Sequence, residues 1–138
     1  MQNPSTAPRF AGILLLLCLL GCHTSEIIPG ATACRHGATA ALTSGTTPTI
    51  TWTPGCTVGY IHIADSTGYP SWIVIDSGTA GPLNALKSGI QYGVVPPEGR
   101  GFGLAAQPLK AGALYLLALR LASIGGNGRL VDTLWFRP

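Results

Sequence analysis

The sequence predicts an all-β protein, an antiparallel β-sandwich of about seven strands that follows an N-terminal signal segment. Three observations favour this class. From Ala38 onward, short runs of alternating apolar and polar residues are separated by Gly, Pro, Asn and Asp. The 19 glycines and 11 prolines are dispersed without a period, which indicates frequent turns and excludes collagen. Apolar residues do not recur at helical spacing, except for a weak helix candidate at Pro82–Lys87.

Residues 1–21 have the layout of a secretory signal peptide. Arg9 supplies a positive charge, an apolar run follows over Ile13–Leu20, and the small residue Gly21 ends the segment. The apolar run is shorter than the roughly 20 residues that a membrane-spanning helix needs. We therefore expect an exported chain rather than a spanning one.

The four residues Leu19-Leu20-Gly21-Cys22 resemble the lipobox of bacterial lipoproteins. The resemblance implies that Cys22 is diacylated and becomes the first residue of the mature chain, anchoring it in a membrane. In proteobacterial lipoproteins an Asp after this Cys tends to retain the protein in the inner membrane. His23 takes that place here, which favours the outer membrane and leaves the side of that membrane open. The alternative is an ordinary signal peptide with a Cys nearby.

The low charge of the chain bears on its partners. Only 9% of the residues are charged, and 8 basic against 5 acidic residues give a net charge of +3. Without a basic cluster, nothing favours a nucleic-acid partner. We expect a membrane contact through the lipid anchor and an envelope protein as a partner, because a weakly charged surface can include apolar contacts.

After the signal segment, we expect a tether over residues 22–36 and one sandwich domain over residues 37–138. The first hairpin of the domain joins strands at Ala38–Leu42 and Thr49–Thr53 through a turn rich in Ser, Gly, Thr and Pro. In the second of these strands the apolar Ile50 and Trp52 share one face.

Two cysteines remain once Cys18 leaves with the signal peptide and Cys22 is acylated. In an oxidising compartment, Cys34 and Cys56 can form one disulfide. Each lies eleven positions from Gly45, taken as the centre of the turn, so the two should meet at the open end of the hairpin. Such a bridge should stabilise the fold by about 3 kcal/mol.

A zinc site at Cys34, His36 and Cys56 is the alternative use of these thiols. It lacks a fourth ligand, and the chain has no Cys-x-x-Cys pair. We therefore expect no metal and no cofactor.

The following strands continue the alternation. In Tyr60–Asp65 the apolar Ile61 and Ile63 point inward, and a turn leads on to a strand at Ser71–Asp76.

Two strands are expected near the C-terminus. The longest strand has four residues on its inner face: Tyr115, Leu117, Leu119 and Leu121. Gly125–Gly128 predicts a hairpin turn before the last strand, Leu130–Phe136. The buried face of that last strand stays ambiguous, because apolar residues occur on both parities.

Three segments carry a family resemblance. Thr49–Pro54 followed by Val58–Ile63 is similar to the B and C strands of fibronectin type III domains. Leu109–Tyr115 looks like the Leu-x-Pro-Gly-x-x-Tyr corner of that family, with Ala111 in place of the proline. The resemblance implies an immunoglobulin-like sandwich and a tyrosine corner, in which Tyr115 points inward and its hydroxyl bonds backbone upstream.

Residues 47–138 also look like small bacterial lipoproteins of this type. The shared features are the Trp52–Cys56 segment, the Ser88–Pro97 segment and the closing Phe136–Pro138. This resemblance implies no settled activity.

The sharpest catalytic motif is Ile73–Ala80, which resembles the apolar-apolar-Asp-Ser/Thr-Gly motif of aspartic proteases, including the dimeric retropepsin-like ones. That chemistry needs two carboxylates that share one proton, so a homodimer would contribute Asp76 twice. The nearest match to the glycine-containing partner strand of the family is Ser123–Gly125, which a turn and a strand follow instead of a helix. The alternative is a strand that ends in an Asp-Ser-Gly turn.

Other motifs give weaker indications. No Gly-x-Ser-x-Gly sequence supports a nucleophilic triad. The glycine-rich segment Gly99–Gly103 lacks the following Lys-Ser/Thr of a phosphate loop and is predicted to be a loose loop. His62 should lie on an outer sheet face. Three aromatic residues could form a binding face or pack in the core: Tyr60, Trp72 and Trp135.

The sequence thus favours a lipid-anchored cell-envelope protein whose single β-sandwich is a binding or structural module without catalytic activity. The alternative is a homodimeric retropepsin-like aspartic protease that uses Asp76. A carrier of a small apolar ligand is the third hypothesis.

Overall fold

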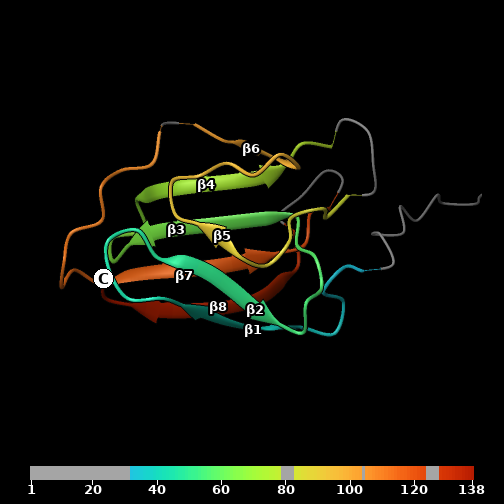
Figure 1. Cartoon of the computed structure of the whole chain (residues 1–138), viewed down its shortest axis with the longest axis horizontal. Coiled ribbons are helices and arrows are strands. Elements are labelled where there is room, and N and C mark those ends of the chain that lie inside the picture. The colour runs from blue at the N-terminus through green and yellow to red at the C-terminus, as the bar shows by residue number, and fades with distance from the viewer. Residues whose placement is uncertain (1–31, 79–82, 104, 124–127) are drawn as a thin grey trace, which may run out of the picture.

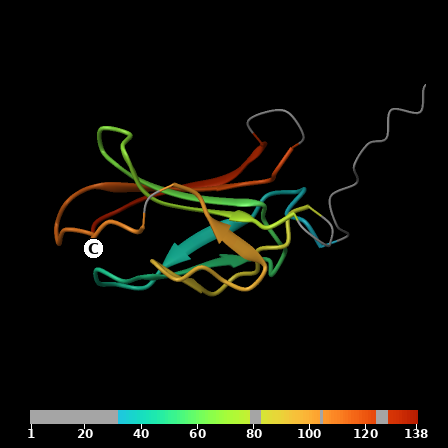
Figure 2. The same cartoon turned by 90° about the horizontal axis from the view of Figure 1, so that it is seen from above.

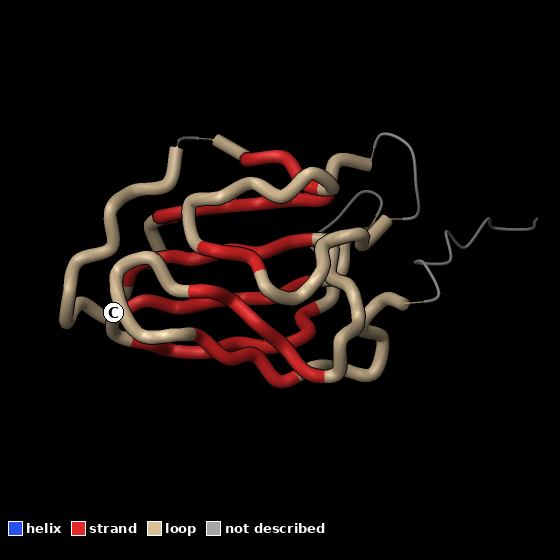
Figure 3. Tube along the Cα trace, viewed as in Figure 1, coloured by secondary structure: helices blue, strands red, loops and turns tan. Residues whose placement is uncertain are grey.

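The β-strands of the chain form two antiparallel sheets that face each other (Figures 1 and 2). The structure, a computed structural model, describes residues 32–78, 83–103, 105–123 and 128–138. The signal segment, Cys22 and the tether up to residue 31 lie outside these residues. The predicted all-β sandwich is confirmed, and no described residue is helical (Figure 3).

The smaller sheet has the strand order β1-β2-β5 and the larger sheet β6-β4-β3-β7-β8. The bounds of the strands are β1 Thr39–Leu42, β2 Thr49–Thr53, β3 Tyr60–Asp65, β4 Pro70–Asp76, β5 Ile90–Gln91, β6 Gly99–Gly101, β7 Tyr115–Arg120 and β8 Leu130–Phe136.

The core lies between the two sheets, where the alternating apolar residues meet. Ile50 and Trp52 of β2 are buried against Ile61 and Ile63 of β3 in one apolar cluster. The predicted inner face of β7 is also buried, since Tyr115, Leu117, Leu119 and the following Leu121 all belong to this cluster. Burying each large apolar side chain contributes about 1.5–3 kcal/mol, so this cluster holds the layers together.

A β-bulge resolves the ambiguous faces of β8. Leu119 pairs with Asp132 and Arg120 with Leu130, so Val131 is an extra residue opposite this step. The inward parity changes there, and the core contacts of β8 come from Val131, Leu134 and Phe136. The prediction that β7 is the longest strand is wrong: β7 has 6 residues, and β4 and β8 have 7 each.

The predicted disulfide between Cys34 and Cys56 is confirmed, but the hairpin centre that was used to predict it is wrong by one residue, which shifts the strand register by two. Thr39 pairs with Thr53, which centres the hairpin on Thr46 instead of Gly45. The β1–β2 ladder ends at Thr53, because the next residue, a proline, has no backbone N–H to donate.

Beyond that point the chain before β1 runs parallel to the chain after β2. The Cys34 N–H donates to the Thr57 carbonyl at 2.9 Å, and Ala33 and Thr57 form a parallel bridge. Residues 32–35, the end of the expected tether, are therefore attached to the sandwich.

Two local predictions were wrong. Gly99–Gly101, predicted to be loop, is the edge strand β6 and pairs with Val74–Asp76 of β4. A side chain at Gly99 would come within 3.0 Å of Leu86 and of Val74, so the close approach of this strand requires glycine. In the helix candidate, the described residues 83–87 are not helical, and Leu86 instead bridges to Val58 across the sheets.

Candidate functional site

A cleft of about 580 Å³ opens on the outer face of the larger sheet. Its floor comes from Tyr60 and His62 of β3 and Ile75 of β4, which are half-buried and alternate with the core residues of the same strands. The residues that follow β4 and β7 contribute its walls, including Ser77 and Ala122. The cleft is thus built where β3 begins and where β4 and β7 end (Figure 1).

Four side chains form one row across this end of the sheet. Arg100 of β6 is opposite Ile75, Ile75 is opposite Tyr60, and Tyr60 is opposite Arg120 of β7. Directly opposite residues in antiparallel strands project from the same face. Two arginines therefore flank an apolar and aromatic floor, with their Cα atoms separated by three strand spacings, about 14 Å.

Asp76, the acidic residue of the protease-like motif, lies at the buried end of the cleft and is 7% exposed. One oxygen of its carboxylate accepts the backbone N–H of Asn84, and its own N–H donates to the Gly59 carbonyl at 2.9 Å. The side chain of Asp76 thereby holds the segment after β4, and its backbone holds the segment before β3.

Asn84 completes this polar cluster. It is 2% exposed and has a φ of +72°, a left-handed conformation that asparagine tolerates better than most residues. Its Oδ1 accepts the Ala122 N–H at 2.5 Å, which joins the segment after β7 to the same cluster. Gly59 lies so close that a Cβ there would overlap Asn84 and Ala122. These contacts connect three segments that are distant in the sequence.

His62 lies on the outer face, as the sequence led us to expect. Its Nε2 is buried and has no hydrogen-bond partner among the described residues, and its ring lies 6.1 Å from the ring of Tyr60. Burial lowers the pKa of His62, and the nearby positive charge of Arg120 lowers it further. Burial raises the pKa of Tyr60, and the charge of Arg120 opposes that shift.

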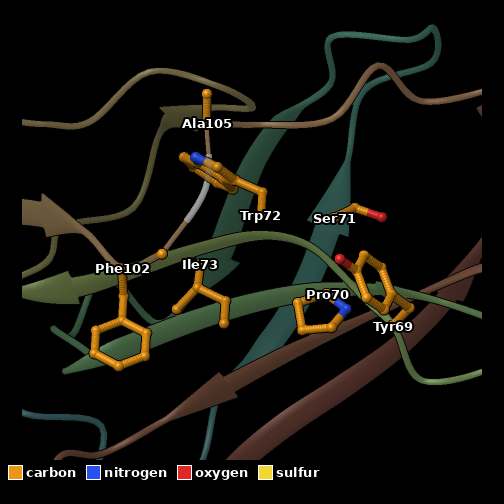
Figure 4. A pocket seen from close by; sticks show the side chains of 8 residues that line it. Tyr69, Pro70, Ser71, Trp72, Ile73, Phe102 and Ala105 are labelled. Carbon is orange, nitrogen blue, oxygen red and sulfur yellow. The ribbon is translucent and has the colours of Figure 1, made fainter.

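A second, smaller pocket of about 250 Å³ lies at the opposite end of β4 (Figure 4). Tyr69 and Phe102, each 60% exposed, flank it, together with Pro70 and Ile73. Figure 4 shows Ile73 and Phe102 pointing to one side of β4 and Trp72 to the other. This pocket has no signature in the sequence, because Phe102 and Tyr69 line one pocket only through the pairing of β6 with β4.

The three aromatic residues that could have formed a binding face are not brought together. Trp72 is buried in the core, with its ring 5.2 Å from that of Tyr92. Tyr60 belongs to the large cleft, and Trp135 is 54% exposed on β8, opposite Leu116.

Tyr115 lies where the resemblance to a tyrosine corner implied. It is buried at the start of β7, and its hydroxyl oxygen accepts the Lys110 N–H, five residues upstream, at 3.0 Å. The cysteines of the zinc alternative are both used by the disulfide.

The described residues include no group of three or more His, Cys, Asp or Glu residues that could hold a metal ion. Nor does any helix in this part of the chain have the length and hydropathy to cross a bilayer.

Comparison with known proteins adds no relative: no protein-family model matches the chain, and no curated protein or solved structure shows significant similarity to it.

Proposed function

We propose that the protein is a lipid-anchored cell-envelope module whose fibronectin type III-like sandwich binds a ligand and catalyses no reaction. The observation on which this rests is the large cleft. The cleft is open to a ligand, and the carboxylate of Asp76 in it already accepts a hydrogen bond from the Asn84 N–H. Two further features support the family assignment. β2 and β3 coincide with the segments similar to the B and C strands, and the Tyr115 hydroxyl contacts the backbone of Lys110.

The lipid anchor is tested by metabolic labelling with a radioactive or clickable fatty acid. We expect the wild-type protein to be labelled and to sediment with membranes, and we expect the Cys22→Ala variant to lose both properties. Cys18→Ala is the matched control, because that cysteine would be removed with the signal segment. Label that survives Cys22→Ala contradicts the anchor.

An aspartic protease is the second candidate. It is favoured by one observation, that Asp76 ends a buried strand, is followed by Ser77 and Gly78, and lines the cleft. We expect no cleavage of a peptide library at acid or neutral pH. Cleavage that disappears in the Asp76→Asn variant would establish the protease and overturn the binding module.

A further inference from the structure

The large cleft has the chemistry of a site for an organic anion. Arg100 and Arg120 stand at the two ends of the cross-strand row. Among the described residues, neither guanidinium forms an ion pair with a carboxylate. Arg120 donates from Nη1 to the Gly128 carbonyl at 3.2 Å, which fixes its position and leaves donors of the planar fork for a ligand.

The acidic residue of the cleft does not cancel these two charges. Asp76 is the acidic side chain among the described lining residues, and the cleft therefore carries a formal charge of about +1 at neutral pH with His62 neutral. The carboxylate of Asp76 is buried and already accepts a backbone N–H, whereas Arg100 is exposed at the rim.

The floor between the arginines is suited to an apolar group. Ile75 and the ring of Tyr60 lie side by side in the row, and His62 extends the floor along β3.

We propose that this cleft binds an amphiphilic organic anion, with a phosphate or carboxylate held between Arg100 and Arg120 and an apolar body on Tyr60 and Ile75. This inference names the ligand class of the binding module proposed above and does not depend on acylation of Cys22.

The position of the cleft in the sandwich suggests two sources for such a ligand. The described chain begins beside the cleft, because the Thr32 hydroxyl contacts the Thr57 hydroxyl at 3.3 Å and Gly59 lines the cleft two residues later. An anchor at Cys22 would lie ten residues before Thr32, within about 35 Å of it. The anion could therefore be the headgroup of an envelope lipid or a soluble amphiphile.

Isothermal titration calorimetry of the purified full-length protein tests the ligand class, with octyl phosphate and octanoate below their critical micelle concentrations as probes. We expect both probes to bind, with octyl phosphate at least tenfold tighter than inorganic phosphate, because only the amphiphile covers the floor. Octylammonium should not bind. Binding to vesicles is then compared between phosphatidylglycerol, which is anionic, and phosphatidylcholine. Binding to phosphatidylglycerol vesicles alone indicates a lipid headgroup, and binding to neither indicates a soluble ligand.

Charge-removing variants assign the binding to this cleft. Arg100→Gln and Arg120→Gln should each weaken octyl phosphate binding at least tenfold, whereas Lys110→Gln, the loss of one exposed positive charge at the other end of the sandwich, should leave it unchanged. Arg100 is exposed, so its variant should keep the wild-type unfolding temperature. Failure of both anionic probes to bind, equal binding of octylammonium, or unchanged affinity in both arginine variants would overturn the inference. Fatty-acid labelling and peptide cleavage report on the proposed function independently of these results.

Discussion

At the scale of single residues, Asp76 shows how a catalytic motif can serve the fold. Its carboxylate accepts the N–H of Asn84, a residue that is itself buried in a left-handed conformation. The Asp-Ser-Gly sequence is compatible with both a protease and a turn, and in the structure its carboxylate accepts a backbone N–H eight residues further along the chain.

This role predicts a specific order of stabilities. Asp76→Ala should lower the free energy of unfolding by about 1–3 kcal/mol, because the buried Asn84 N–H loses its acceptor. Asp76→Asn should cost less, because an amide oxygen can still accept that hydrogen bond. Urea unfolding followed by tryptophan fluorescence measures both. Equal stability of the Ala variant and the wild type would show that this hydrogen bond does not support the fold.

Gly59 is a lining residue whose replacement should disturb the packing around the cleft. A methyl group at this position would overlap Asn84 and Ala122, so Gly59→Ala should lower the free energy of unfolding by about 1–3 kcal/mol. Gly55→Ala is the matched control, since a Cβ there meets no atom within 4 Å. Thermal unfolding of the two variants should separate them, and similar melting temperatures would contradict the close packing at Gly59.

Tyr92 joins the loop after β5 to the edge of β4. Its hydroxyl donates to the Gln107 carbonyl at 2.5 Å and lies 3.2 Å from the Ser71 carbonyl. Burial, together with the neighbouring Tyr115, raises the pKa of Tyr92 to about 12. Tyr92→Phe should cost about 1–2 kcal/mol at pH 7, whereas Tyr69→Phe, at an exposed position, should change stability by less than about 0.5 kcal/mol.

The alkaline behaviour of Tyr92 has a definite sign. The unfolded chain releases the phenol proton near pH 10, and the folded chain retains it to about pH 12, so stability should decrease over that window. Chemical unfolding at pH 9 and pH 11 should show a smaller decrease in the Phe variant. An equal decrease in both proteins would assign the alkaline loss to other groups.

At the scale of elements, strands with alternating side chains could be predicted from the sequence and glycine-rich or irregular ones could not. The sequence located β2, β3 and β7 because one face of each is apolar and buried, and it located β8 from the glycine-rich turn that precedes it. It missed β6, whose Gly-Arg-Gly sequence has a single side chain and thus no alternation to detect. Which side chains of β8 face the core could also not be predicted, because one bulge residue changes which alternate positions point inward.

The pairing of Cys34 with Cys56 fixes the segment before β1 to the segment after β2. Arg129 adds to this attachment by donating to the Cys34 carbonyl at 3.3 Å. Replacing both cysteines by alanine should lower the free energy of unfolding by about 3 kcal/mol, because the 22-residue separation then no longer restricts the unfolded chain. Denaturant unfolding of the oxidised protein and of the double variant measures this difference. Insensitivity of the oxidised wild type to reductant would contradict the stabilising role.

At the scale of the whole molecule, the cleft depends on the order of strands in the larger sheet. Its two arginines come from β6 and β7, and the floor between them comes from β3 and β4. The sequence separates the four residues of the cross-strand row by 15 to 60 positions and gives no signal for their register, so the candidate site could not be predicted from it. Three lining residues were named in advance: Asp76 for its motif, His62 for its place on an outer face, and Tyr60 as one of three aromatic residues that could form a binding face.

The pH dependence of folding stability tests this arrangement as a whole. Tyr60 on the same strand, Arg120 on β7 and the apolar Ile73 on β4 lie around His62, and no described residue forms a hydrogen bond with its buried Nε2. Because burial and Arg120 lower its pKa, the folded protein takes up a proton at a lower pH than the unfolded chain does. Below about pH 6.5 the unfolded state therefore binds more protons, and stability should decrease as the pH falls.

Asp65 should add its own loss only at lower pH, since hydrogen bonds from Thr67 and Tyr69 lower the pKa of its carboxyl below the ordinary value of 3.8. A comparison of urea midpoints at pH 7.5 and pH 5 therefore isolates His62. His62→Gln should reduce the decrease between these two values, whereas His36→Gln, at an exposed position before β1, should leave it as in the wild type. If His62→Gln keeps the pH dependence of the wild type, then burial and Arg120 do not oppose protonation of His62 in the folded protein. That result would contradict the electrostatic description of the cleft.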